Sequence, residues 1–191
     1  MYIIIGFFLV GGLIFYLTSC KNSTTSAKIH KPKERITRID NLETLLSSVD
    51  MTGSIIELDN FIGELCSYGD EMAVLTEPQK QFYYNQCLER EVNNGGFSQY
   101  FYNSSGGFAH QTVISLRTIE ANITAEILQN AIDQFPNKKV PQDRAERQDI
   151  LEKIQDTAEP IWEELDKKFF EYQDDLNTLN LNFVRQNKND F

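Results

Sequence analysis

Few residues in this sequence combine a catalytic or metal-binding type with a useful spacing. The chain has two histidines, His30 and His110, and neither has a second histidine or a cysteine at the spacing of a metal-ligand set. We find no phosphate-binding loop, no dinucleotide fingerprint and no nucleophile turn. We therefore expect no catalytic residue, no metal, no cofactor and no enzymatic activity.

Negative charge is the chemistry that the sequence does offer. After Asp40 there are 26 acidic and 12 basic residues, a net charge of −14, whereas the whole chain carries −10. Between Asp143 and Asp175, twelve acidic and five basic residues give −7. Such a surface repels nucleic acid and attracts basic proteins, so we expect a basic protein surface as the partner and no direct nucleic-acid binding. The alternative is that the charge only keeps the domain soluble.

The expected partner surface lies in this most acidic segment. Its carboxylates are Asp149, Glu152, Asp156, Glu159, Glu163, Glu164, Asp174 and Asp175. Some of them follow helical steps, but we expect Thr157 and Pro160 to interrupt that row. Carboxylates four residues apart are about 6 Å apart along a helix axis, whereas the phosphates of one DNA strand advance about 3.4 Å, so imitation of DNA needs rows from more than one helix.

A second unusual segment, residues 91–106, combines turn-forming residues with aromatic rings. Its motif residues are Glu91, Asn93, Asn94, Gly95, Gly96, Phe97, Gln99, Tyr100, Phe101, Asn103 and Gly106. We expect one glycine of the pair to adopt the left-handed angle that ends a helix, the asparagines to close turns, and the rings to be buried. Glu91 and Gln99 are expected to connect loops by hydrogen bonds. We interpret the segment as a structural corner; a ligand pocket, or the site of an enzyme of unknown type, is the alternative.

Apolar residues after Asp40 recur at helical spacing almost throughout, which predicts an all-α domain, a single compact bundle of six to seven helices. We expect Thr52 to cap the first helix, which ends at Gly69, and Pro78 to open a second that stops at residues 93–96. Short helices follow over 97–102, 113–119, 123–132 and 141–154. Thr157 is expected to cap the longest and last helix. Its expected buried stripe is Ile161, Leu165, Phe169, Tyr172, Leu176 and Leu179.

The N-terminal part differs from the rest. Residues 2–18 carry no charge and are rich in large apolar residues, so residues 1–19 are interpreted as a signal peptide or membrane anchor, and residues 20–39 as a basic flexible tether before the acidic domain of residues 40–191. The sequence Leu17-Thr-Ser-Cys20 resembles a bacterial lipobox, which predicts lipidation of Cys20 and a membrane-attached domain outside the cytoplasm.

Two alternatives for this leader stay open. The basic cluster follows the apolar run instead of preceding it, and that order favours a single-pass anchor with a cytoplasmic domain. An incorrectly assigned start is the third interpretation. Cys66 and Cys87 are expected in the core, and in an exported protein they can also pair.

Several groups of residues match a known family. They are Leu75-Thr76 with Gln79 and Phe82-Tyr83, the run from Glu91 to Phe101, Asn103 to Gly106, Leu116 to Ile119, Ala131 with Phe135-Pro136, and Asp143-Arg144 with Glu146-Arg147. At these residues the chain resembles a bacterial family of acidic, all-helical proteins, the DNA-mimic protein family first catalogued as a domain of unknown function. The resemblance covers roughly Leu75 to Leu179, and its most specific part is Asn-Asn-Gly-Gly-Phe.

The resemblance implies a protein whose surface carboxylates imitate DNA phosphates. Such a protein occupies the DNA-binding face of a helix-turn-helix regulator and so relieves repression. The alternative function is that of a lipoprotein immunity or inhibitor protein, in which the same acidic surface neutralises a basic toxin or nuclease. A homodimer is a further possible assembly.

The lipobox match predicts a covalent lipid on Cys20. Metabolic labelling with a fatty-acid probe should mark the wild-type chain and should not mark Cys20→Ser, because the thiol is the attachment atom. Equal labelling of the two chains would show that Cys20 carries no lipid.

Overall fold

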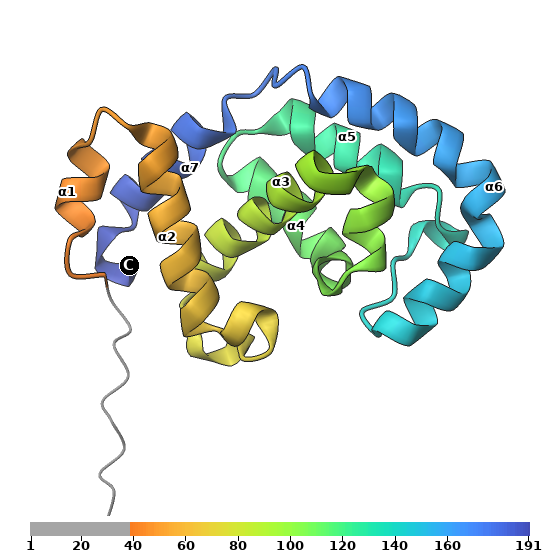
Figure 1. The fold of residues 1–191 in the computed structure, drawn as a ribbon, viewed down its shortest axis with the longest axis horizontal. Coiled ribbons are helices and arrows are strands. Elements are labelled where there is room, and N and C mark those ends of the chain that lie inside the picture. Colours follow the sequence, from red (N-terminus) through yellow and green to blue (C-terminus); the bar gives the residue numbers. More distant parts are fainter. Residues whose placement is uncertain (1–38) are drawn as a thin grey trace, which may run out of the picture. The chain divides into compact units, whose positions relative to one another are not determined.

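The computed structural model describes residues 39–191, which form seven α-helices joined by short 3₁₀ turns and loops (Figure 1). The helices are α1 (Leu42–Ser47), α2 (Met51–Leu65), α3 (Glu77–Tyr102), α4 (Ala109–Thr118), α5 (Asn122–Ile132), α6 (Arg144–Phe169) and α7 (Leu176–Gln186). No strand occurs in this part of the chain, so the all-α prediction is confirmed. The predictions for the leader, for the tether up to residue 38 and for Cys20 lie outside the described residues.

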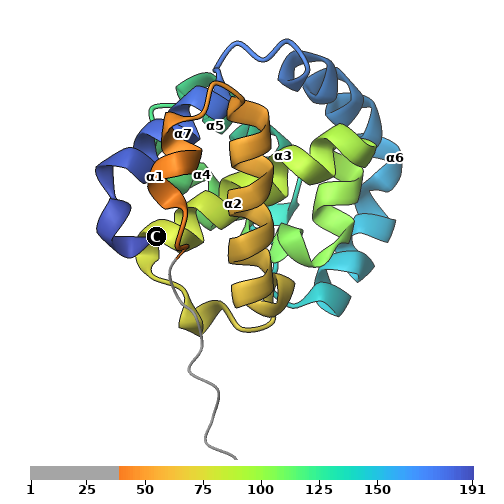
Figure 2. The same ribbon diagram turned by 60° about the vertical axis from the view of Figure 1, so that its left-hand side comes forward.

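Helix α3 is the element on which the others pack. It contacts α2, α4, α6 and α7, and in Figure 1 it runs through the middle of the domain. Its first half, with Phe82 and Cys87, belongs to a core shared with α1, α2 and α7. Its second half, with Phe97 and Phe101, belongs to a core shared with α4, α5 and α6. Figure 2 shows α1, α2 and α7 on one side of α3 and α6 on the other. Within residues 39–191, no helix is long and apolar enough to cross a membrane.

The first helices differ in detail from the prediction. The short α1 was not predicted, although its leucines are buried. Helix α2 begins two residues earlier than expected, because the side chain of Asp50, not that of Thr52, accepts the hydrogen bond from the Gly53 N–H at 2.9 Å. The helix ends at Leu65, and a 3₁₀ turn leads to Gly69. Asp50 thus supplies the capping oxygen that an N-terminal helix end requires.

Helix α6 is continuous where two helices were predicted. Asp143 caps it by accepting a hydrogen bond from the Glu146 N–H at 2.8 Å. Thr157 caps nothing, since its hydroxyl donates to the Ile154 carbonyl 2.9 Å away within the helix. Pro160 lies inside the helix and has no N–H for the carbonyl four residues earlier, that of Asp156, but both residues are exposed, so water can satisfy that carbonyl. The prediction that residues 157–160 begin a new helix is wrong.

The buried face of α6 changes accordingly. Ile161, predicted to be buried, is 42% exposed, and the buried residues of that stretch are Ala158, Trp162, Leu165 and Phe169. The helix ends at Phe169 and α7 begins at Leu176, so the single stripe predicted from residue 161 to residue 179 belongs to two helices. In the continuous helix the buried face is the one that Leu151 shares with Trp162 and Phe169, and Ile161 lies at its edge.

A buried arginine connects α6 to the end of α3. Arg147 is fully buried, and its guanidinium donates to the carbonyls of Phe101 at 2.6 Å, Asn103 at 2.7 Å and Pro141 at 2.8 Å. Burial lowers the pKa of this guanidinium. Gly106 leaves room for it, because a Cβ there would lie 2.8 Å from Nε. One side chain of α6 therefore holds the end of α3 and the loop before α6 by hydrogen bonds.

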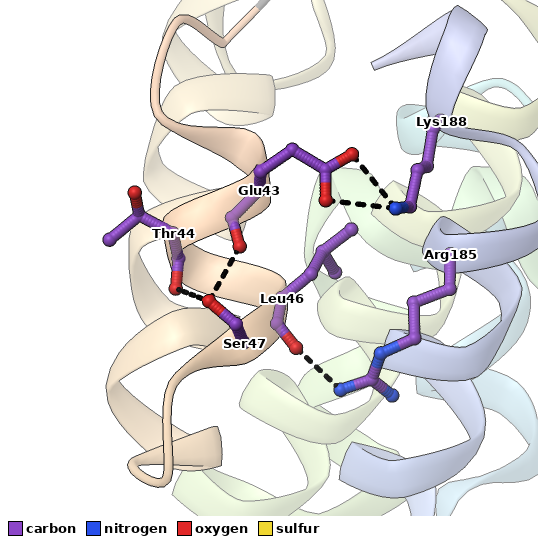
Figure 3. Close-up of polar contacts among 6 residues, drawn as sticks. All are labelled: Glu43, Thr44, Leu46, Ser47, Arg185 and Lys188. Atoms are coloured by element: carbon purple, nitrogen blue, oxygen red, sulfur yellow. Dashed lines mark hydrogen bonds and ion pairs between the residues drawn. The ribbon is translucent and has the colours of Figure 1, made fainter.

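The two ends of the described chain meet. The N–H of Ile39 donates to the Phe191 carbonyl at 2.8 Å, and the ring of Phe191 is buried edge-on against Phe82. Figure 3 shows the polar contacts beside this pair: the Lys188 ammonium binds the Glu43 carboxylate at 2.8 Å, and the Arg185 guanidinium donates to the Leu46 carbonyl at 2.8 Å. We call residues 39–47 together with residues 185–191 the terminal contact.

Replacement of Arg147 should destabilise the domain strongly. We expect Arg147→Met to lower the free energy of unfolding by more than about 3 kcal/mol, because several buried carbonyls lose their donor at about 1–3 kcal/mol each. The control is Arg117→Met, an exposed arginine in the last turn of α4, for which we expect a loss within about 0.5 kcal/mol. Urea unfolding followed by circular dichroism measures both, and equal losses would contradict the role given to Arg147.

Candidate functional site on helix α6

The continuity of α6 places its acidic residues in one unbroken row. Glutamate or aspartate occurs at positions 149, 152, 156, 159, 163 and 166, in alternating steps of three and four residues. Residues at these steps share one face of a helix. At 1.5 Å per residue, the row extends over about 25 Å. The expected interruption at Thr157 and Pro160 is absent.

Two members of the row face the protein. Glu159 accepts a hydrogen bond from the Ser98 hydroxyl at 2.6 Å. Asp166 accepts one from the backbone N–H of Phe97 at 2.8 Å and so caps the helical segment of residues 97–102 from a distant part of the chain. Burial raises the pKa of the Asp166 carboxyl even though this N–H lowers it. These two carboxylates join α6 to the corner, and each of them already has a partner within the domain.

Four members of the row face solvent. Asp149, Glu152, Asp156 and Glu163 are exposed, and none of them makes a hydrogen bond or ion pair with another residue in the described part of the chain. They extend over about 21 Å of a helix that is fixed by its buried face. We call these four residues the free acidic row, and a basic partner can contact them without breaking any bond within residues 39–191.

The remaining carboxylates of the predicted surface have partners within the domain. Glu164 binds the Lys167 ammonium at 2.6 Å. Asp174 accepts from the Thr124 N–H at 2.8 Å, near the start of α5, and is only partly exposed. Asp175 caps α7 by accepting from the N–H of Thr178 at 3.1 Å. Sequence spacing gives no sign of the Asp174 contact, which joins residues fifty positions apart.

Residues 91–106 form a compact corner beside the row. The Glu91 carboxylate accepts hydrogen bonds from the side-chain amides of Gln99 at 2.7 Å and Asn103 at 2.8 Å. The Asn93 amide donates to the Tyr172 hydroxyl at 2.5 Å, while the neighbouring Asn94 is exposed. The polar groups of the corner thus connect α3 to its own end and to the loop after α6.

The glycine pair bends α3 and turns its aromatic end inward. Gly96 has a φ of +72°, whereas the φ of Gly95 is −164°, which is extended backbone. A Cβ on Gly96 would collide with the Asp166 carboxylate. Beyond the bend, Phe97, Tyr100 and Phe101 are completely buried. The bend therefore brings the Phe97 N–H to the carboxylate that binds it, and so fixes the position of α6.

A groove that the sequence did not reveal lies where α6 meets this aromatic segment. It has a volume of about 440 Å³, and Tyr102, Trp162, Asp149, Glu152 and Glu159 are among the residues that line it. The acidic row could be found by its spacing once the helix was taken as continuous through Pro160. The glycine pair predicts the bend on which the aromatic wall depends, but nothing in the sequence indicates that the bent segment lies against α6.

The other residues considered for chemistry are engaged or buried. His110 accepts a hydrogen bond from the Val140 N–H at Nε2, 3.1 Å away. Cys66 and Cys87 are buried free thiols. Over residues 39–191, no three His, Cys, Asp or Glu side chains form a group that could hold a metal ion.

Comparison with known proteins gives one match. Residues 73–187 match the model of a family described as DMP19-like protein, and this range includes α3 to α7. No curated protein matches the chain, and no solved structure does. The matched range contains the corner, Arg147 and the whole acidic row.

The bend at Gly96 predicts unequal effects of two neighbouring substitutions. Gly96→Val should destabilise the fold by about 1–3 kcal/mol, because a β-branched residue resists positive φ, and its Cβ also displaces Asp166. Gly95→Val should cost less, since its backbone angle suits any residue and the nearest obstacle is the end of the flexible Gln99 side chain. Thermal melting compares them, and unchanged melting of Gly96→Val would show that the angle is not required.

Proposed function

The chain belongs to the DMP19-like family, and from this membership and the free acidic row we propose that it is an acidic protein-binding module that acts as a DNA mimic. In this proposal α6 occupies the DNA-binding surface of a basic regulatory protein. The observation that carries the proposal is the set of four exposed carboxylates on one face of a fixed helix, none of which has a partner within residues 39–191. Each of them offers a partner the same chemistry as a phosphate oxygen, a negatively charged hydrogen-bond acceptor.

The spacing of the free acidic row supports contact with a phosphate-binding surface over a limited length. Over about 21 Å of helix the row provides four charges, whereas one DNA strand advances about 3.4 Å per phosphate and provides about six over that length. The row therefore resembles the edge of a single strand at lower charge density. Other charged residues of the domain add to the attraction at a distance, because exposed charges act over about 8–10 Å at physiological salt.

The rigidity of the row favours binding. The opposite face of α6 is held by Trp162, Leu165 and Phe169 in the core, and Asp166 fixes the helix to the corner. A surface that is already in its bound geometry loses little conformational freedom when a partner binds. The free acidic row thus combines accessible charge with a fixed arrangement.

The test compares two sets of neutral substitutions with the same total change of charge. The row variant is Asp149→Asn, Glu152→Gln, Asp156→Asn and Glu163→Gln. The control is Glu64→Gln, Asp70→Asn, Glu120→Gln and Glu126→Gln, four exposed carboxylates on other elements. Asp174 is excluded because it is bonded to the Thr124 N–H. A DNA-binding protein is first captured with the full chain and then purified. Calorimetry measures its affinity for the wild-type chain and for each variant.

We expect the row variant to lose affinity by about ten-fold or more, since four exposed charge pairs at up to about 1 kcal/mol each are removed. The control should lose much less, both variants should melt like the wild type, and added salt should weaken wild-type binding. Duplex DNA carrying the partner's site should compete with the wild-type chain. Equal losses in both variants would remove the row from the proposal. Binding through the row without DNA competition would reject mimicry and favour an inhibitor of another basic protein, such as a toxin.

A further inference from the structure

The groove between α6 and the end of α3 joins carboxylates to aromatic surface. The apolar side chains of Leu151 and Trp162 line it, and Tyr102, which is 55% exposed, forms part of its wall. Asp149 and Glu152 line it from the free acidic row. Its volume of about 440 Å³ lies within the range of about 300–1,000 Å³ that is typical of ligand sites.

The charge of the groove is one-sided. Asp149 and Glu152 have no partner in the described part of the chain, and Glu159 uses Oε2 for the Ser98 hydroxyl. Among the described residues that line the groove there is no lysine or arginine. A cation that enters the groove therefore meets several carboxylates, and the nearby Arg144 guanidinium lies over the Tyr102 ring without lining the groove.

An internal contact shows how the aromatic wall receives a cation. The Arg144 guanidinium lies over the Tyr102 ring, 5.8 Å from its centroid. Its Nε also donates to the Tyr102 carbonyl at 3.3 Å. A planar guanidinium is weakly hydrated and stacks on aromatic faces, which an ammonium does less well. The same ring that borders the groove thus already binds a guanidinium of this chain.

We infer that the groove binds an arginine side chain of the basic partner, with Glu152 and Asp149 receiving its guanidinium and Tyr102 contacting its plane. This inference rests on the proposed function and names the chemical group that part of the free acidic row recognises. It makes the row unequal: the end at residues 149–152 is selective for arginine, and the end at Glu163 contributes charge alone. Arginine is preferred because its fork of donors can bind a carboxylate with two hydrogen bonds.

The test uses two peptides of equal charge, acetyl-(Arg-Gly)₃-amide and acetyl-(Lys-Gly)₃-amide, titrated into the full chain. Trp162 is the only tryptophan of the sequence and lines the groove, so its fluorescence reports binding there. The variants are Glu152→Gln in the groove, Glu163→Gln further along the same row as the matched control, and Tyr102→Leu in the aromatic wall.

We expect the wild-type chain to bind the arginine peptide more tightly than the lysine peptide. Glu152→Gln should weaken binding of the arginine peptide about three- to five-fold, as expected for the loss of one direct ion pair. Glu163→Gln should weaken it less than two-fold, because Glu163 does not line the groove. Tyr102→Leu should bring the two peptides closer in affinity. Equal affinity of the two peptides for the wild type, or equal effects of Glu152→Gln and Glu163→Gln, would overturn the inference.

This outcome is separable from that of the proposed function. Equal peptide affinities together with a loss of partner binding in the four-residue row variant would reject the arginine groove alone. If the arginine peptide binds selectively but the four-residue row variant binds the partner as tightly as the wild type does, the proposed function is rejected. The groove would then bind arginine independently of any role of the row in partner binding.

Discussion

The guanidinium of Arg147 lies where the end of α3, the loop before α6 and the first turns of α6 meet. It donates to backbone carbonyls from two of these segments, and no carboxylate within residues 39–191 forms an ion pair with it. Carbonyls near a helix end carry partial negative charge, so they can stabilise a buried cation. In a domain with a net charge of −14 after Asp40, this arrangement uses no acidic side chain to hold the cation. The position of α6, and with it the direction of the free acidic row, depends on this interaction.

Helix α6 divides one row of carboxylates between two tasks. Glu159 and Asp166 bind Ser98 and the Phe97 N–H, so they hold the helix on the corner. The members between and beside them face solvent, with the same side-chain chemistry and a spacing of three or four residues. The exposed carboxylates are therefore positioned by the buried ones of the same row. Both the groove and the proposed binding surface result from this division.

The sequence was sufficient for the parts of the fold that local rules decide, and insufficient where distant contacts override them. Helical spacing and the residues 93–96 predict the helices and the bend before Phe97. A proline inside a helix costs about 3 kcal/mol, so Pro160 predicts a helix start; burial of Ala158, Trp162 and Leu165 favours a continuous α6 instead. The acidity predicts a charged surface, but the use of Asp174 as a cap for α5 arises only in the folded chain.

The terminal contact has a mechanical consequence. A pull on the chain at Ile39 acts first on the bond to Phe191 and then on the pairs of Glu43 with Lys188 and Leu46 with Arg185. In Figures 1 and 2, α1 and α7 lie on the side of the domain away from α6. The contacts that first resist a force applied at Ile39 are therefore those of α1 with the segment after α7, and they lie on the other side of the domain from the free acidic row.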